Sequence, residues 1–500
     1  MSAKAVMCQG TGSHVGKSVV VAALCRLYAR DGYRVAPFKA QNMSNNSFVT
    51  ADGGEMGRAQ VFQAQAAGVE PVVNMNPILL KPDADTRAQV VRLGQPVSAM
   101  QVREYHDYQA LAWPAVTGAY DQLSREYDLI VLEGAGSPAE INLRDRDIVN
   151  MKMAQYARSP VILIGDIERG GVFASLYGTV ELLDPDERRM VKAFLINKFR
   201  GDASLLDSGY ENLAERTSIP VLGTLPYVFG LPVDEEDAVV LQAAGGRVGT
   251  GVLDIGVIHL PHISNATDFQ PLATEVDVTI RYIESAESFG RPDVVILPGT
   301  KSTVADFEWM QRQGLARLVE AHRQRGGWTI GICGGYQMLG ERILDPEGVE
   351  SGRKAVPGLG LLPVVTTFKA RKRLVRVEAI SRLPGVEAPV RGYEIHQGRT
   401  ESGDLPAAFH LTRQFDEPID LADGAAQGVA CFGTYLHGLF DHGGFRRAYL
   451  NALRQHKDLG PLPPHAYDTR PKDFDQLADW LLDNVDRPLL ESVVGLSLRN

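Results

Sequence analysis

A glycine-rich stretch near the N-terminus constrains the fold of this chain more than any other feature. An apolar run at 4–9 predicts a buried strand, GTGSHVGKS follows at 10–18, and a helix is expected at 19–28. A strand, a glycine-rich loop ending in Lys-Ser and a helix, in this order, are typical of a phosphate-binding loop. The loop is a variant, because Gly10 and Gly16 stand further apart than the glycines of the usual motif.

The chemistry expected of this loop comes from its backbone and from two side chains. Consecutive N–H groups and the helix dipole hold phosphate oxygens, Lys17 supplies a positive charge, and the Ser18 hydroxyl is a ligand for Mg²⁺. A glycine-rich turn with an incidental lysine is the alternative, which the position between strand and helix disfavours. The residues predicted to bind nucleotide phosphates are Gly12, Ser13, His14, Val15, Gly16, Lys17 and Ser18.

Carboxylates at the ends of later strands complete a predicted magnesium site. The apolar run at 129–132, which follows Asp128, ends in Glu133 and a Gly-x-Gly, as in a Walker B-type strand that holds Mg²⁺ or orients its waters. The polar loop after the strand expected at 34–39 contains Asp52 and Glu55, each a candidate ligand or an ordinary solvated carboxylate. The predicted Mg²⁺ ligands are Ser18, Asp52 and Glu133.

The order of the expected elements divides the chain into domains. Strands alternate with helices across 4–226, which implies a mostly parallel sheet covered by helices. The fold class is therefore α/β, with two doubly wound, mostly parallel-sheet domains and a helical C-terminal extension. In that extension Phe474, Leu477, Leu481 and Val485 are spaced for an amphipathic helix. A first domain is expected at 1–233, a charged, glycine-rich linker at 234–251, a second domain at 252–445 and the extension at 446–500.

A second strand-to-helix turn, GICGGYQML at 331–339, predicts a nucleophile. Cys333 lies between glycines directly after an apolar run, and a strained turn of this kind needs small neighbours. The helix N-terminus favours thiolate over thiol, and the N–H of Gly334 is placed to stabilise an oxyanion. The loop at Gly299 is a candidate for the second oxyanion donor. A buried structural cysteine is the alternative.

The best candidate for the base that serves Cys333 is His437. It ends an apolar strand and precedes a glycine in the same expected domain as the turn. His396 is the competitor, because it also ends an expected strand there.

Composition excludes several classes of function. The net charge of −10 and pI of about 5.6 argue against a general nucleic-acid or anionic-membrane binder. The four cysteines form no CxxC pair and no disulfide framework, so a reducing cytoplasm is expected. We find no secretory segment and no apolar stretch near the length of a membrane span, so no membrane partner is expected.

Five stretches of the chain resemble the cobyric acid synthases of the cobalamin pathway. The resemblance covers nearly the whole chain and implies a dethiobiotin-synthetase-type P-loop domain followed by a flavodoxin-like class I glutamine amidotransferase domain. KAQNMSNN is the most family-specific stretch, whereas the Cys333 turn fits any class I amidotransferase. The stretches are GTGSHVGKS at 10–18, KAQNMSNN at 39–46, DIERGGVF at 166–173, GICGGYQML at 331–339 and GTYLHG at 433–438.

The resemblance implies a specific reaction. ATP, with Mg²⁺, activates the b, d, e and g carboxylates of adenosylcobyrinic acid a,c-diamide as acyl phosphates, and ammonia from L-glutamine converts them to amides, giving adenosylcobyric acid. No tightly bound cofactor is implied, and the oligomeric state is left open. One alternative is the a,c-diamide synthase reaction on the same corrinoid. Another is a P-loop ATPase switch with an inert amidotransferase-like domain, although Thr11 and Gly12 stand where such switches often have a second lysine.

The chain departs from the class I amidotransferase pattern at one position. Those enzymes usually have a glutamate two residues after the histidine, and here that position is Leu439. The site is therefore expected to work as a Cys–His dyad or to recruit another acid. Glu394 is a candidate by its location alone.

Overall fold

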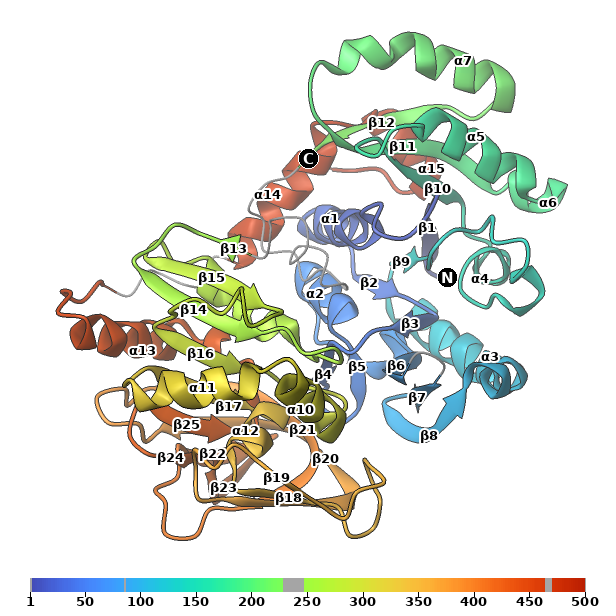
Figure 1. Ribbon diagram of the computed structural model, residues 1–500. Coiled ribbons are helices and arrows are strands. Elements are labelled where there is room, and N and C mark those ends of the chain that lie inside the picture. The colour runs from blue at the N-terminus through green and yellow to red at the C-terminus, as the bar shows by residue number, and fades with distance from the viewer. Residues whose placement is uncertain (1, 85–86, 228–246, 464–469, 500) are drawn as a thin grey trace. The chain divides into compact units, whose positions relative to one another are not determined.

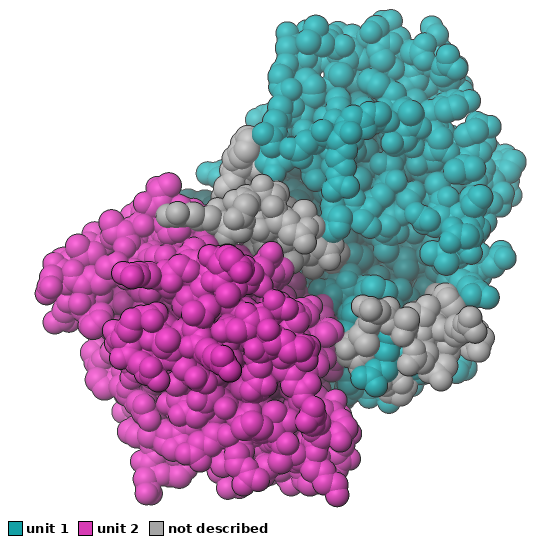
Figure 2. Space-filling view, viewed as in Figure 1, with its two compact units in different colours: residues 1–44, 54–234, 469–500 teal, residues 45–53, 235–468 magenta. Residues whose placement is uncertain are grey.

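The chain forms two compact units. The computed structural model describes residues 2–84, 87–227, 247–463 and 470–499. Unit 1 comprises 1–44, 54–234 and 469–500, and unit 2 comprises 45–53 and 235–468 (Figure 2). Most of the linker predicted at 234–251 lies outside the described residues.

Within the described residues, unit 1 is built on a parallel six-stranded sheet of order β12-β11-β10-β1-β9-β2 (Figure 1). This confirms the mostly parallel sheet expected from the alternation of strands and helices. β1 lies between β9 and β10 in the interior of the sheet, so the loop that follows it emerges at the carboxyl edge, where open α/β sheets bind ligands. The strands are β1 (Lys4–Gly10), β2 (Val35–Phe38), β9 (Leu129–Glu133), β10 (Val161–Asp166), β11 (Val191–Phe199) and β12 (Val221–Pro226).

Helices cover this sheet, and one group of them comes from the C-terminal end of the chain. α1 (Lys17–Arg30) packs on β1, β2 and β9, and α14 (Arg470–Leu482) packs on α1 (Figure 1). Phe474, Leu477 and Leu481 are buried in the same apolar cluster as α1, which explains their helical spacing. Val485, predicted as part of the same helix, lies beyond its end and forms a β-bridge with Gly223. Further helices of unit 1 are α2 (Arg58–Ala66), α3 (Val102–Glu126), α4 (Met151–Ala157), α5 (Val172–Leu182), α6 (Pro185–Arg188), α7 (Asp207–Thr217) and α15 (Arg487–Val494).

A small second sheet of unit 1 has the order β3-β6-β7-β8. Its strands are β3 (Gln41–Met43), β6 (Ile78–Ala84), β7 (Arg87–Arg92) and β8 (Gln95–Gln101). β3 pairs in parallel with β6, and Lys39 just before it donates its backbone N–H to Met75. The polar stretch at 39–44 is therefore fixed at its backbone beside the main sheet.

The main sheet of unit 2, as far as the structure describes it, has the order β13-β15-β14-β16-β17-β25-β24. Its five interior strands are parallel and its two edge strands are antiparallel. The buried apolar side chains of these strands form one core with the surrounding helices. The strands are β13 (Arg247–Val248), β14 (Leu253–Ile258), β15 (Val278–Ile283), β16 (Val294–Leu297), β17 (Trp328–Ile332), β24 (Ala425–Ala426) and β25 (Cys431–Thr434).

Unit 2 also contains a second, largely antiparallel sheet, whereas the sequence predicted a mostly parallel one. Its core is the long pair β20 (Val365–Ser381) and β21 (Pro389–Glu401). β26 (Leu436–His437) pairs with β21 and so brings His437 to this sheet. The remaining strands are β18 (Arg342–Leu344), β19 (Ala355–Pro357), β22 (Phe409–Gln414) and β23 (Glu417–Asp423).

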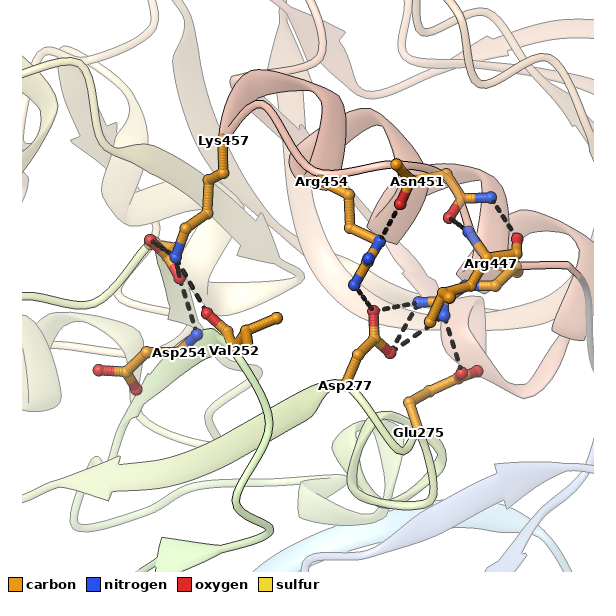
Figure 3. A network of polar contacts seen from close by, with 11 residues as sticks. Val252, Asp254, Glu275, Asp277, Arg447, Asn451, Arg454 and Lys457 are labelled. Atoms are coloured by element: carbon orange, nitrogen blue, oxygen red, sulfur yellow. Dashed lines mark hydrogen bonds and ion pairs between the residues drawn. The ribbon is translucent and has the colours of Figure 1, made fainter.

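Within unit 2, ion pairs connect helix α13 (Gly443–His456) to Glu275 and Asp277 (Figure 3). Arg447 donates to Asp277 at 3.0 Å and lies 3.5 Å from Glu275, and Arg454 donates to Asp277 at 3.1 Å. Pairing of this kind offsets the cost of burying each charge. In the part of 446–500 that the structure describes, α13 packs in unit 2, whereas α14 and α15 pack in unit 1. No helix in the described ranges has both the length and the apolar character needed to cross a membrane.

Candidate functional site

The phosphate-binding loop lies between the end of β1 and the start of α1. Gly16 caps the helix with φ of 94°, a left-handed conformation that favours glycine, and a Cβ there would overlap the amide nitrogen of Asn197. That amide donates to the carbonyl of Val15 at 2.9 Å and so ties the loop to β11. Lys17 is buried and its ammonium donates to the carbonyl of Gly12 at 2.8 Å. The lysine thus folds back over the loop, where phosphate oxygens are expected.

Glu133 is the centre of a buried polar cluster beside this loop. Its carboxylate accepts from Ser18 Oγ at 2.9 Å, from Lys39 Nζ at 2.9 Å and from the Gln63 amide. Burial alone would raise the pKa of Glu133, but the charge and hydrogen bond of Lys39, the hydrogen bond of Gln63 and the charge of Lys17 hold it below its ordinary value. The carboxylate is therefore ionised at neutral pH.

A hydroxyl and an ionised carboxylate in contact are donors of the kind that Mg²⁺ prefers. Ser18 and Glu133 therefore fit the predicted ion, which takes its other ligands from nucleotide phosphates and water in such sites. Among the described residues, no group of three or more His, Cys, Asp or Glu side chains would hold a metal ion. Asp52 belongs to unit 2, and its carboxylate accepts from the Thr50 hydroxyl. Its role as a ligand stays a prediction.

Cys333 forms a strained turn between β17 and α12 (Gly334–Leu339). Its φ of 52° and ψ of −108° lie in a region that a cysteine rarely adopts. A Cβ on Gly335 would overlap the carbonyl of Leu297, which explains the small residue at that position. Cys333 donates its backbone N–H to Thr434 at 2.8 Å, so the turn is anchored to β25.

His437 lies beside Cys333 and is held by an aspartate that sequence reasoning missed. Its Nδ1 is 2.7 Å from Oδ2 of Asp268, and both side chains are 1% exposed. Burial alone would lower the pKa of His437, but the charge and hydrogen bond of Asp268, together with those of Cys333, raise it to about 10. Oδ1 of Asp268 accepts the N–H of Gly438 at 3.0 Å. Cysteine, histidine and aspartate thus form a connected series.

The other candidates for the base and the acid have different partners. His396 stacks on Tyr435 with 3.7 Å between ring centroids, and its Nδ1 is 2.7 Å from the carbonyl of Gly398. Glu394, suggested by location, pairs instead with Arg373 and with Nε2 of His396. The acid that contacts His437 is therefore Asp268. Its one sequence clue is the polar stretch that follows the apolar strand β14.

The two predicted oxyanion residues border the Cys333–His437 pair. A Cβ on Gly299 would lie 3.0 Å from Cε1 of His437, and one on Gly334 would lie 3.1 Å from the backbone nitrogen of Thr300. The loop after β16 and the start of α12 therefore meet next to the imidazole. Their role as oxyanion donors stays a prediction.

Two family models match the chain and correspond to its two halves. Residues 6–237 match the CobQ/CobB/MinD/ParA nucleotide binding domain, and 254–445 match the CobB/CobQ-like glutamine amidotransferase domain. The first range includes the phosphate loop and Glu133. The second includes Cys333, Asp268 and His437.

Curated relatives match the chain over almost its whole length. A cobyric acid synthase of Dehalococcoides mccartyi (strain CBDB1) is 47% identical over 99% of this chain and 100% of its own. That of Sorangium cellulosum (strain So ce56) is 49% identical over 100% of both chains, and that of Klebsiella pneumoniae (strain 342) is 51% identical over 96% of both. With identity at this level across both halves, the chain belongs to the cobyric acid synthase family.

Proposed function

We propose that this protein uses ATP and glutamine to amidate four side-chain carboxylates, b, d, e and g, of adenosylcobyrinic acid a,c-diamide, which gives adenosylcobyric acid. The observation that carries the proposal is the series Cys333, His437 and Asp268 in a chain that also contains a phosphate loop with an ionised Glu133. One centre supplies ammonia and the other activates the acceptor. In an inert amidotransferase-like domain, a buried Asp268 hydrogen-bonded to His437 would have no catalytic role.

Glutamine hydrolysis follows from the geometry around Cys333. The thiolate attacks the side-chain amide carbon of glutamine, and the protonated imidazole of His437 gives its proton to the departing ammonia. A thioester remains on Cys333. His437 then takes a proton from water, which attacks the thioester and releases glutamate. Gly334 and Gly299 are proposed to donate hydrogen bonds to the oxyanion of each tetrahedral intermediate.

Carboxylate activation is assigned to the phosphate loop. The substrate carboxylate attacks the γ-phosphorus of ATP, which forms an acyl phosphate and ADP, and ammonia then displaces phosphate to leave the amide. Lys17 offsets the negative charge that develops on the transferring group. Mg²⁺, which Ser18 and Glu133 would hold, offsets further charge when it is bound.

The proposal is tested by following the corrinoid product. Incubation with adenosylcobyrinic acid a,c-diamide, ATP, Mg²⁺ and glutamine should give four successive amidations by mass spectrometry, each with one glutamate and one ADP released. Cobyrinic acid without the a and c amides is the comparison substrate. Amidation of that substrate at a and c would favour the diamide synthase reaction, and glutamate-free ATP hydrolysis would favour a switch protein.

A further inference from the structure

A segment of the nucleotide-binding half of the sequence belongs by its contacts to unit 2. Residues 45–53 lie within the family model at 6–237 but group with the amidotransferase unit. The segment contains β4 (Ser47–Val49), and only Ser44 separates it from β3, which is paired in unit 1. Its side chains contact two parts of unit 2 that hold His437.

The first contact is a reciprocal pair of asparagines at the start of η4 (Ala266–Phe269). Oδ1 of Asn46 accepts from the N–H of Ala266 at 3.1 Å, and Oδ1 of Asn265 accepts from the N–H of Ser47 at 2.8 Å. Asn265 is buried, with φ of 53°, a conformation that asparagine tolerates better than most residues. The N–H of Asp268 donates to the carbonyl of Asn265 at 2.9 Å. The pair thus fixes the turn that carries Asp268.

The second contact passes through an aromatic ring. Phe48 meets the ring of Tyr393 edge-on at 4.9 Å between centroids, and Tyr393 stacks on the imidazole of His437 at 5.5 Å. Tyr393 is 1% exposed, so its ring has little room to move. His437 is therefore held at Nδ1 by Asp268 and on one face by Tyr393, and the segment 45–53 supports both.

We propose that Asn46 and Phe48 are positioning residues for glutamine hydrolysis, acting on His437 through the Asp268 turn and the Tyr393 ring. The inference rests on the proposed glutaminase function. The imidazole must give a proton to ammonia and then take one from water, so its orientation governs the rate of both steps. Lys39 contacts Glu133 and Asn46 contacts the Asp268 turn, so one short stretch of chain carries contacts to both proposed centres.

The test compares Asn46→Ala, Asn46→Asp and Phe48→Leu with an exposed control in the same segment, Ala51→Ser. For N46A we expect kcat for glutamate release to fall roughly 10- to 100-fold with the KM for glutamine near its wild-type value, because the proton-transfer geometry is loosened. Ammonia-dependent amidation should stay at the wild-type rate. N46D should recover most of the activity, because its carboxylate accepts the same N–H. F48L should show a smaller loss, and A51S none.

Three outcomes would overturn the inference. They are a wild-type kcat in N46A, an equal loss of glutamine- and ammonia-dependent rates, and an N46D variant as impaired as N46A. Failure of the wild-type protein to release glutamate would instead overturn the proposed function, and this inference with it. Wild-type glutamate release with an unimpaired N46A overturns the inference alone.

Discussion

At the scale of single residues, Asp268 stabilises the protonated form of the His437 imidazole. A buried imidazole without a partner loses its proton easily, because the low-dielectric interior penalises the charged form. The carboxylate of Asp268 at 2.7 Å is the larger of two influences, with Cys333 the other, that reverse this balance and bring the pKa of His437 to about 10. A protonated imidazole beside Cys333 is ready to protonate departing ammonia.

Asp268→Asn should therefore slow glutamine hydrolysis and change its pH dependence. The amide removes the charge that stabilises the imidazolium, so the pKa of His437 falls and the alkaline limb of the pH–rate profile moves to lower pH. By analogy with other histidine-orienting carboxylates, kcat should fall roughly 10²- to 10⁴-fold. Glutamate release measured across pH checks this. Glu394→Gln is the control, and an alkaline limb that moves in E394Q but stays in D268N would contradict the assignment.

At the scale of elements, motifs that are local in the chain were predictable and long-range partners were not. The strand–loop–helix at 10–18 and the turn at Cys333 are specified by neighbouring glycines, so their form follows from the sequence. Asp268 reaches His437 across 169 positions, and no spacing rule connects them. The placement of Asn46 against η4 likewise depends on tertiary packing. The antiparallel pair β20–β21 has a register that only the folded unit specifies.

The buried ion pairs between α13 and the rest of unit 2 are expected to stabilise the folded protein. Arg447 is almost fully buried and contacts both Glu275 and Asp277. Arg447→Met should lower the free energy of unfolding by about 3 kcal/mol, because it leaves two buried carboxylates with fewer partners. Chemical denaturation monitored by intrinsic fluorescence measures the change. Arg312→Met, which removes an exposed pair with Glu308, should change stability by less than about 0.5 kcal/mol. Equal effects of the two variants would contradict the argument.

At the scale of the whole molecule, each proposed half-reaction draws its groups from one unit. In the described part of the chain, the side chains that donate hydrogen bonds to Glu133 all come from unit 1. The side chains of Asp268 and Tyr393, which contact His437, both come from unit 2. The family model at 6–237 contains Lys17 and Glu133, and the one at 254–445 contains Cys333, Asp268 and His437. Damage to one centre should therefore leave the chemistry of the other intact.

Lys17→Ala tests this separation from the nucleotide side. Loss of the ammonium that offsets charge on the transferring phosphoryl group should lower amidation roughly 10²- to 10³-fold with either glutamine or ammonium as nitrogen source. Glutamate release without corrinoid should stay at the wild-type rate, because Lys17 lies in the other unit. Amide product and glutamate are measured in parallel. An ammonium-supported rate that survives in K17A would contradict the assignment of phosphoryl transfer to this loop.

Cys333→Ala tests the separation from the other side. Without the thiolate no thioester forms, so glutamine-dependent amidation should fall by roughly 10⁴-fold or more. Ammonium at saturating concentration should still support all four amidations near the wild-type rate, because acyl phosphate formation needs only the phosphate loop and its bound ATP. Cys431→Ala, at another buried cysteine of unit 2, is the control and should keep both activities. If C333A loses amidation with ammonium as well, the two centres do not work separately, and carboxylate activation must depend on the amidotransferase unit.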